Sequence, residues 1–395
     1  MKILQLTKKF PFPLKDGESI AVDSLSRSLV QLGCEVHLLS MNTSKHYVDV
    51  DSIRSKIEHY THVATSFVDN KLTPWAALTN LASSTSYHIS RFDYEDFREQ
   101  LKWILADEDF DIVLMESIYL APYIDDVRAV TNIPIVMRAH NVEHEIWQRI
   151  VQQTTNFLKK WYLRILVQRL KVYELAQLIR IDGLITFTER DLQFFRKHDF
   201  VGHGLVAPIG IDTQKYSAKE SKENPTVAFI GSLDWLPNTE GLEWFIKKVW
   251  PIVLRKKPEA KLHIAGRNPE KSIFKYNSES IIVHGEVPDA TAFVSAHAIS
   301  IVPLLSGGGM RVKILEAMAL SRAIVSTKVG AEGIESPSIL LADEPQDFAQ
   351  AILQLLSEPS QIAQVGRQAR ADVEAKYDSE ANGSAVYQFL KMLKK

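Results

Sequence analysis

The chain has 395 residues, of which 46% are hydrophobic and 24% charged, and its formal net charge is -2. This composition is typical of a soluble globular protein, and the length predicts two or three domains. A charge so close to zero argues against a protein that coats nucleic acid, which would be strongly basic, so no nucleic-acid partner is expected. Cys34 is the only cysteine, which excludes an internal disulfide and favours a reducing, cytoplasmic location.

The first ten residues, MKILQLTKKF, contain too short an apolar run for a signal peptide. They predict a first strand instead. No apolar run reaches the roughly 18 residues that a membrane-spanning helix needs.

Further apolar runs predict short strands along the whole chain. In chain order the first half contains KILQLT, CEVHLLS, DIVLMES, IPIVMRA and GLITFT, and the second half contains TVAFIGS, KLHIAG, SIIVHG, ISIVPLL, AIVST and ILLAD. Between the first two runs, a helix face is predicted by the spacing of Val22, Leu25, Leu29 and Leu32. Gly33 follows as a C-terminal cap. Strands that alternate with helices predict parallel sheets covered on both faces, an α/β fold.

One long polar stretch, IGIDTQKYSAKESKENPT at residues 209–226, predicts the divide between two doubly wound domains. We expect the first domain at residues 1–208 and the second at 209–376. In such sheets ligands bind beyond the carboxyl ends of the strands. Residues that directly follow a strand are therefore the first candidates for a site.

The segment SGGGMRVKILEA, residues 306–317, lies between a predicted strand, ISIVPLL, and a predicted helix, MRVKILEAMAL. Glycines let the backbone approach a ligand closely, and the start of a helix favours an anion such as phosphate. Arg311 and Lys313 would add positive charge, and Glu316 could accept hydrogen bonds from sugar hydroxyls. The alternative is a flexible loop with a surface pair of Lys313 and Glu316. Neither a P-loop nor a G-x-G-x-x-G fingerprint occurs, so ATPase and dehydrogenase functions lose support.

With its flanks, this segment resembles the donor-binding segment of retaining glycosyltransferases of family 4, over PLLSGGGMRVKILEAMALSRAIVSTKVGAEGIE. FIGSLDWLPNTEGLEWF is similar to the first strand and loop of their donor domain, in the branch that carries W-x-P-N. VAPIGID resembles the junction between their domains. FPFPLKDGESIAVDSLSRSL resembles their first loop and helix, and RAHNVEH their loop after the fourth strand. The resemblance covers essentially the whole chain in the expected order.

The resemblance implies a GT-B fold, with two Rossmann-like domains that face each other across a cleft and a C-terminal helix at 377–395 that packs back on the first domain. It implies transfer of a sugar from a UDP- or GDP-sugar to an acceptor hydroxyl, with retention of configuration and without a metal or other cofactor. The acceptor would be a surface polysaccharide or a lipid-linked glycan. The sugar, the base and the linkage are not implied.

Site roles also follow from the resemblance. His140 would hydrogen-bond the donor sugar, Arg311 and Lys313 would neutralise the diphosphate, and these three are the catalytic candidates. Glu316 would hold the ribose, and Gly17 would approach the diphosphate. The donor-binding candidates are Gly17, Gly231, Asn238, Ser306, Gly307, Gly308, Gly309, Met310 and Glu316.

Three departures from the family pattern bear on these roles. Gly308 stands where many members carry the first of two glutamates, so sugar recognition must come from backbone N–H groups or from elsewhere. Ser232 and Glu240 replace an arginine and a lysine, whose charge we expect Arg311 and Lys313 to supply. Glu18 follows Gly17 where paired glycines are common. Since no candidate nucleophile stands out, we expect front-face attack by the acceptor hydroxyl, with the leaving phosphate as base.

Other functions also fit parts of the sequence. HNVEH, residues 140–144, matches the H-x-x-E-H pattern of inverted zinc proteases, although a strand that ends at His140 would separate its two histidines. DVD, residues 49–51, matches the D-x-D of metal-dependent glycosyltransferases but lies in a polar segment. A nucleotide-sugar 2-epimerase and a non-catalytic sugar-nucleotide-binding module remain alternatives. The epimerase would convert the donor without an acceptor.

Residues 146–181 form a basic segment with Trp147, Trp161 and Tyr162 among its cations and Glu174 as its one acid. Its cations are Arg149, Lys159, Lys160, Arg164, Arg169, Lys171 and Arg180. A basic amphipathic helix with aromatic residues can lie on an anionic membrane, which would place the protein at the inner face of the membrane. The alternative is a long helix that packs its leucines on the first domain and leaves its charges in solvent.

Overall fold

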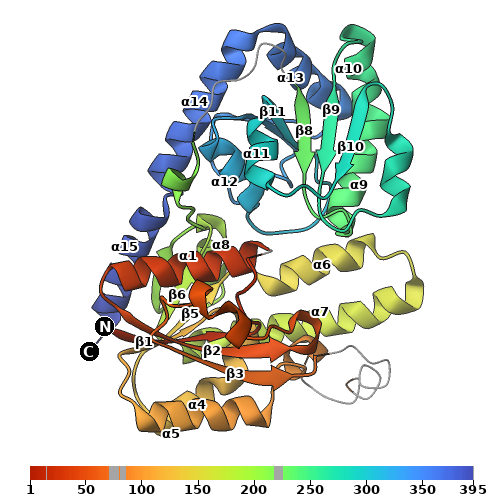
Figure 1. Ribbon diagram of the computed structural model, residues 1–395. Coiled ribbons are helices and arrows are strands. Elements are labelled where there is room, and N and C mark those ends of the chain that lie inside the picture. Colours follow the sequence, from red (N-terminus) through yellow and green to blue (C-terminus); the bar gives the residue numbers. More distant parts are fainter. Residues whose placement is uncertain (15, 71–79, 81–85, 218–225, 395) are drawn as a thin grey trace. The chain divides into compact units, whose positions relative to one another are not determined.

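The computed structural model describes residues 1–14, 16–70, 80, 86–217 and 226–394. The backbone divides into two compact units (Figure 1), which are Met1–Gly210 with Ser379–Lys395, and Ile211–Asp378. The boundaries expected from the sequence were 208/209 and 376/377. Residues 218–225 of the polar stretch, and Lys395 of the expected C-terminal helix, lie outside the described residues.

The first unit contains a seven-stranded parallel sheet in the order β3-β2-β1-β4-β5-β6-β7. Its strands are β1 Lys2–Thr7, β2 Glu35–Thr43, β3 His62–Val68, β4 Ile112–Met115, β5 Ile135–Ala139, β6 Gly183–Thr186 and β7 His203–Val206. The five strands predicted in this half are confirmed. The two that were missed, β3 and β7, are the edge strands.

Helices surround this sheet. They are α1 Gly17–Gln31, α3 Tyr87–Ser90, α4 Glu95–Asp107, α5 Ile124–Val130, α6 Glu143–Gln153, α7 Phe157–Gln177, α8 Glu189–Lys197 and α15 Ser379–Leu393, with 3-10 turns at Ser44–His46, Asp51–Lys56, Ile118–Tyr123 and Leu178–Arg180. The Asp16 carboxylate caps α1 by accepting from Ser19 N, and Gly33, at φ 82°, follows its C-terminus as predicted. α15 packs against α1, where Ser28 Oγ donates to Ser379 O at 3.0 Å.

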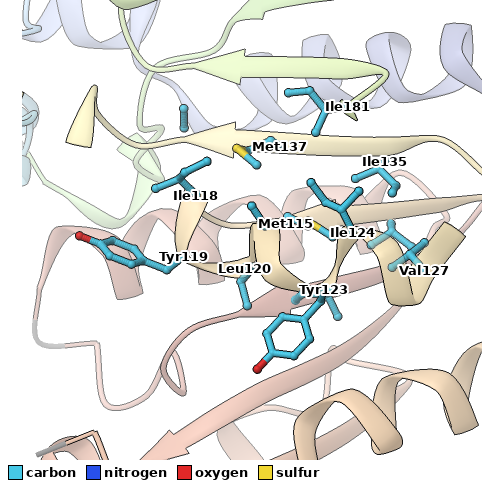
Figure 2. Packing of buried hydrophobic residues seen from close by; sticks show 14 of the residues in the cluster. Met115, Ile118, Tyr119, Leu120, Tyr123, Ile124, Val127, Ile135, Met137 and Ile181 are labelled. Carbon is cyan, nitrogen blue, oxygen red and sulfur yellow. The ribbon is translucent and has the colours of Figure 1, made fainter. Parts of the chain in front are cut away.

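The turn that follows β4, Ile118–Tyr123, contributes several side chains to the hydrophobic core of this unit (Figure 2). Leu120 and Tyr123 of this turn are fully buried, in the same cluster as Met115 of β4 and Met137 of β5. The Tyr123 hydroxyl donates to Phe92 O at 2.8 Å, which satisfies its polar end in the core. This packing holds the carboxyl ends of β4 and β5, where the candidate site of this unit begins.

The basic segment differs from the single long helix that was expected. It forms two helices, α6 and α7, which pack against each other as a hairpin (Figure 1). The break lies at residues 154–156, where the Asn156 side chain caps α7 by accepting from Lys159 N. Asn is a preferred N-cap residue, so a helix start at this position has a local cause. Within the described residues, no helix is both long enough and apolar enough to cross a membrane.

The second unit contains a six-stranded parallel sheet in the order β10-β9-β8-β11-β12-β13. Its strands are β8 Val227–Ile230, β9 Leu262–Ala265, β10 Ile281–Gly285, β11 Ile299–Val302, β12 Ala323–Ser326 and β13 Ile339–Leu341, all in predicted runs. Its helices are α9 Leu236–Trp244, α10 Trp250–Lys256, α11 Ala290–Ser295, α12 Val312–Ala319, α13 Pro345–Ser357 and α14 Pro359–Lys376, with a π-helical turn at Phe245–Val249 and 3-10 turns at Thr213–Lys215 and Lys271–Tyr276.

Candidate active site

In the second unit, the glycine-rich loop joins β11 to α12, as predicted. The helix begins at Val312, two positions later than the sequence suggested, because Arg311 occupies the N-cap position in an extended conformation. Gly307 and Gly309 have φ angles of 94° and 84°, which favour glycine. A Cβ atom on Gly307 would lie 2.9 Å from Arg311 Nη2. The backbone conformation at 307 therefore favours glycine, and a side chain there would displace the guanidinium.

Arg311 is held against this loop. Its Nη1 donates to Gly308 O at 2.5 Å, and its guanidinium carbon lies 5.2 Å from the centre of the Trp235 ring. Stacking on an aromatic ring is a contact that suits a planar guanidinium. These contacts hold a permanent positive charge at the N-terminus of α12.

Lys313 does not form the surface pair with Glu316 that the alternative interpretation required. Its Nζ donates to Asn238 Oδ1 at 3.0 Å and to Ile230 O at 3.2 Å, at the end of β8. Burial, reinforced by the nearby Arg311 charge, lowers the pKa of Lys313 to about 7. Within the described part of the chain, no carboxylate lies within ion-pair distance of this ammonium. Anion binding would supply the missing negative charge.

Two further predicted residues lie beside Lys313. The Asn238 side chain also donates to Ser232 O at 2.9 Å. A Cβ atom on Gly231 would lie 2.8 Å from Asn238 Nδ2 and 3.2 Å from Lys313 Nζ. The structure thus brings Gly231, Asn238 and Lys313 together at the carboxyl end of β8.

Glu316 lies one turn into α12 and accepts a hydrogen bond from the Tyr216 hydroxyl at 3.2 Å. Burial raises the pKa of Glu316, against the effect of this hydrogen bond. Burial and the Glu316 carboxylate raise the pKa of Tyr216 in turn. Tyr216 was not predicted, because it is far from Glu316 in sequence and follows no predicted strand.

Glu240 also reaches the glycine-rich loop, where its Oε2 accepts from Ser306 Oγ at 3.0 Å. Ser306 is buried, whereas Glu240 is exposed. This contact brings a carboxylate to the loop whose own sequence has glycine at 308. Met310, also predicted in the donor site, is buried, and no polar role follows from its position.

In the first unit, a buried polar cluster surrounds His140, which directly follows β5. Its Nε2 lies 2.9 Å from Glu116 Oε2. Glu116 follows β4 and also accepts from Gln5 Nε2 at 2.7 Å and from Arg138 Nη1 at 3.2 Å. Burial opposes the negative charge, but Arg138 and His140 outweigh it and lower the pKa of Glu116. A fixed carboxylate at Nε2 leaves Nδ1 as the ring nitrogen available to a ligand.

The loop after β1 adds cations that the sequence reading did not single out. Gly17 begins α1, and Glu18 beside it lies 3.4 Å from Lys8 Nζ and 3.5 Å from Lys9 Nζ. Burial opposes the charge of Glu18, but Lys8, Lys9 and His140 together lower its pKa. The structure therefore brings Gly17 and His140 to the same region of this unit. Lys8 and Glu116 directly follow strands and Lys9 comes one residue later, so the rule that selected His140 could also have found them.

The two metal motifs have little geometric support. In HNVEH, α6 begins at Glu143, so His140 and His144 do not share a helix, and His144 Nδ1 bonds Glu174 Oε2 at 2.5 Å. Asp49 and Asp51 of DVD are exposed and bond within a local turn. No group of three or more His, Cys, Asp or Glu side chains that could hold a metal ion occurs among the described residues.

Residues 224–358 match the model of the family Glycosyl transferases group 1. An uncharacterized 44.6 kDa protein in the cps region of Klebsiella pneumoniae is 26% identical over 307 residues, which cover 73% of this chain and 76% of that protein.

Among solved structures, sucrose-phosphate synthase from Thermosynechococcus elongatus has a TM-score of 0.72 at 18% identity and covers 100% of this chain and 99% of its own. The fold is GT-B.

Two other solved structures have the same architecture. A TarM mutant from S. aureus, in complex with fondaparinux, alpha-GlcNAc-glycerol and UDP, has a TM-score of 0.70 at 12% identity and covers 100% of both chains. Anabaena Alr3699/HepE in complex with UDP-glucose has a TM-score of 0.65 at 14% identity and covers 99% of this chain and 100% of its own. These solved structures show the fold, and the match to the family Glycosyl transferases group 1 supports a glycosyltransferase and does not favour the epimerase.

Proposed function

We propose that the chain is a retaining glycosyltransferase that moves a sugar from a UDP- or GDP-sugar to an acceptor hydroxyl without a metal ion. The observation that carries the proposal is the pair of cations at the glycine-rich loop, Arg311 and Lys313. Lys313 is partly buried and bonded only to neutral acceptors among the described residues. Even a partly buried cation without a negative partner is costly unless a ligand of opposite charge completes the site.

The chemistry of glycosyl transfer fits this arrangement. The bond between the anomeric carbon and the diphosphate breaks, so negative charge develops on the leaving oxygen. Preorganised donors at such an oxygen contribute about 2.7–4 kcal/mol each. Arg311 and Lys313, at the start of α12, would stabilise the leaving diphosphate in this way, and Gly307 and Gly309 would let the backbone approach it.

Two carboxylates would orient the donor. The Tyr216 hydroxyl bonds Oε1 of Glu316, and the other carboxylate oxygen would accept from the ribose hydroxyls. Glu240, bonded to Ser306, would take over the hydroxyls of the transferred sugar in place of the missing acid at Gly308. The sugar-binding role thus moves from the loop itself to the helix α9 beside it.

His140, positioned by Glu116, would bond the donor sugar through Nδ1. Retention would proceed by front-face attack of the acceptor hydroxyl, with the leaving phosphate as base. UDP and UDP-glucose in the complexes of GT-B relatives favour a UDP-sugar donor. The relative from a cps region supports a surface polysaccharide or a lipid-linked glycan as acceptor. We place the enzyme in the cytoplasm, where its single unpaired cysteine would stay reduced.

The test is thermal unfolding with UDP, GDP, ADP, CMP and dTDP in the presence of EDTA, on the wild type, Arg311→Ala and the matched control Arg255→Ala. Arg255 is an exposed arginine of the same unit. A ligand at a hundred times its Kd stabilises by about 2.7 kcal/mol, or several degrees at roughly 2–4 °C per kcal/mol. We expect one nucleotide to shift the wild type and Arg255→Ala but not Arg311→Ala. No shift with any nucleotide would refute the donor site, and donor turnover without acceptor would favour the epimerase.

A further inference from the structure

The second helix of the α6–α7 hairpin exposes large apolar side chains to solvent. Phe157 is 78% exposed, Leu158 72%, Trp161 53% and Val172 62%, and Ile150 at the end of α6 is 39% exposed. Scattered exposed apolar residues are normal in soluble proteins. A group of them on one helix, with a further one near the end of the helix before it, indicates an interaction surface.

The spacing of these residues places them on one face of α7. Phe157 and Trp161 are four positions apart, and Leu158 and Trp161 three, so their side chains are neighbours on the helix surface. The opposite face carries the buried leucines Leu163, Leu166 and Leu170, which pack into the first unit. At about 100° per residue, the outward face is centred near Trp161 and continues to Val172. The helix thus has two apolar faces, and the described residues of the first unit cover only one of them.

Cations border the outward apolar face. At about 100° per residue, Lys160, Arg164 and Lys171 lie along one edge of this apolar face, and Lys159 is exposed near the turn. The one acid of residues 146–181, Glu174, is 2% exposed. Its carboxylate accepts from the backbone N–H of Glu143 and from His144, and so caps the start of α6. The exposed charge of this segment is therefore entirely positive, although the whole chain has a net charge of -2.

We propose that this outward face of α7, with the turn before it, docks on an anionic lipid surface. Apolar side chains flanked by lysine and arginine can insert at the boundary between headgroups and acyl chains while the cations contact anionic headgroups. A second copy of the chain fits less well, because the same face would set Lys160 and Arg164 against their like-charged equivalents. The inference does not require glycosyl transfer, although a lipid-linked acceptor would be presented at this surface.

Co-sedimentation with vesicles tests the proposal. The assay is run without nucleotide, so that its outcome does not depend on the nucleotide-binding test above. The full chain is mixed with vesicles of phosphatidylcholine alone or of phosphatidylcholine with phosphatidylglycerol. The apolar variant is Phe157→Ala/Trp161→Ala. Its control is Trp103→Ala, a tryptophan of α4 that is 64% exposed in the same unit. The charge variant is Lys159→Glu/Lys160→Glu, with Lys248→Glu/Lys256→Glu, exposed in the second unit, as its control.

We expect wild type and both controls to bind anionic vesicles at low salt and to bind pure phosphatidylcholine weakly. Binding should fall by about tenfold or more in the apolar and the charge variants, and in high salt. Circular dichroism and thermal unfolding would verify that the variants are folded, which surface substitutions on α7 should allow. No binding by the folded wild type at low salt would overturn the proposal. Equal binding by wild type and the α7 variants would also overturn it.

Discussion

Replacing Lys313 by methionine would remove the partly buried ammonium while keeping a side chain of similar length. In the wild type, folding lowers the pKa of Lys313 from 10.5 to about 7. Between these two pH values the unfolded chain holds a proton that the folded chain has released. The free energy of unfolding therefore rises with pH across this window.

The size of the effect follows from the two pKa values. Integrated from pH 6 to pH 9, the difference in proton binding stabilises the folded wild type by at most about 2.7 kcal/mol. Lys313→Met lacks this titration. The loss of its hydrogen bond to Asn238 shifts the stability of the variant by an amount that does not depend on pH. We expect the stability of the wild type relative to Lys313→Met to rise by about 1–2.7 kcal/mol from pH 6 to pH 9.

Urea unfolding at pH 6, 7, 8 and 9 measures this difference, and Lys256→Met, an exposed lysine of the same unit, is the control. A difference between wild type and Lys313→Met that stays constant from pH 6 to pH 9 would refute the reasoning. The same titration predicts proton uptake when an anionic donor binds. Calorimetry at pH 8 with a nucleotide sugar, in two buffers of different ionisation enthalpy, should detect nearly one proton taken up by the wild type and none by Lys313→Met.

Two further predictions follow from single contacts. Glu240→Gln should lower kcat/KM for the sugar donor by about 10-fold or more while leaving the Kd for the free nucleotide unchanged. If affinity for the free nucleotide fell by the same factor as kcat/KM, Glu240 would act on the nucleotide part of the donor instead. Glu174→Ala removes the cap of α6 and the partner of His144, and should destabilise the first unit by about 2–4 kcal/mol in urea unfolding. A loss below about 0.5 kcal/mol would mean that water replaces the carboxylate.

The strands that the sequence did not predict show what an apolar pattern can detect. Interior strands such as β4 are buried on both faces, so IVLM stands out as a continuous apolar run. The edge strand β3, HVATSFV, has only two buried residues, and its Phe67 side chain is 57% exposed. In β7, HGLV, no residue is fully buried. Edge strands therefore mix polar and apolar residues, and pairing with one neighbour, which is not local in sequence, decides their conformation.

The site shows the same limit. The order of glycines, cations and glutamate in the loop before α12 made an anion site predictable, because it depends on residues close in sequence. The partners of those residues come from elsewhere in the chain. Tyr216 bonds Glu316, a hundred positions away in sequence, and Ile230 O bonds Lys313, eighty-three positions away. Such contacts depend on how β8 and β11 lie side by side in the sheet.

The contacts of Lys313 and Arg311 link the departures from the family pattern at positions 232, 240 and 308 to one another. Lys313 Nζ bonds Ile230 O, directly before Gly231 and Ser232. An arginine at 232 would place a further cation near an ammonium whose pKa burial and Arg311 already lower, and like charges would weaken it as an anion ligand. A carboxylate at 308 would stand next to Arg311, whose Nη1 bonds Gly308 O, and would neutralise it. Serine at 232 and glycine at 308 therefore add no charge beside Lys313 and Arg311, while Glu240, bonded to Ser306, brings a carboxylate to the loop from α9. These linked changes support the proposal that the donor site carries its charges at positions different from those of the family pattern and uses them for the same functions.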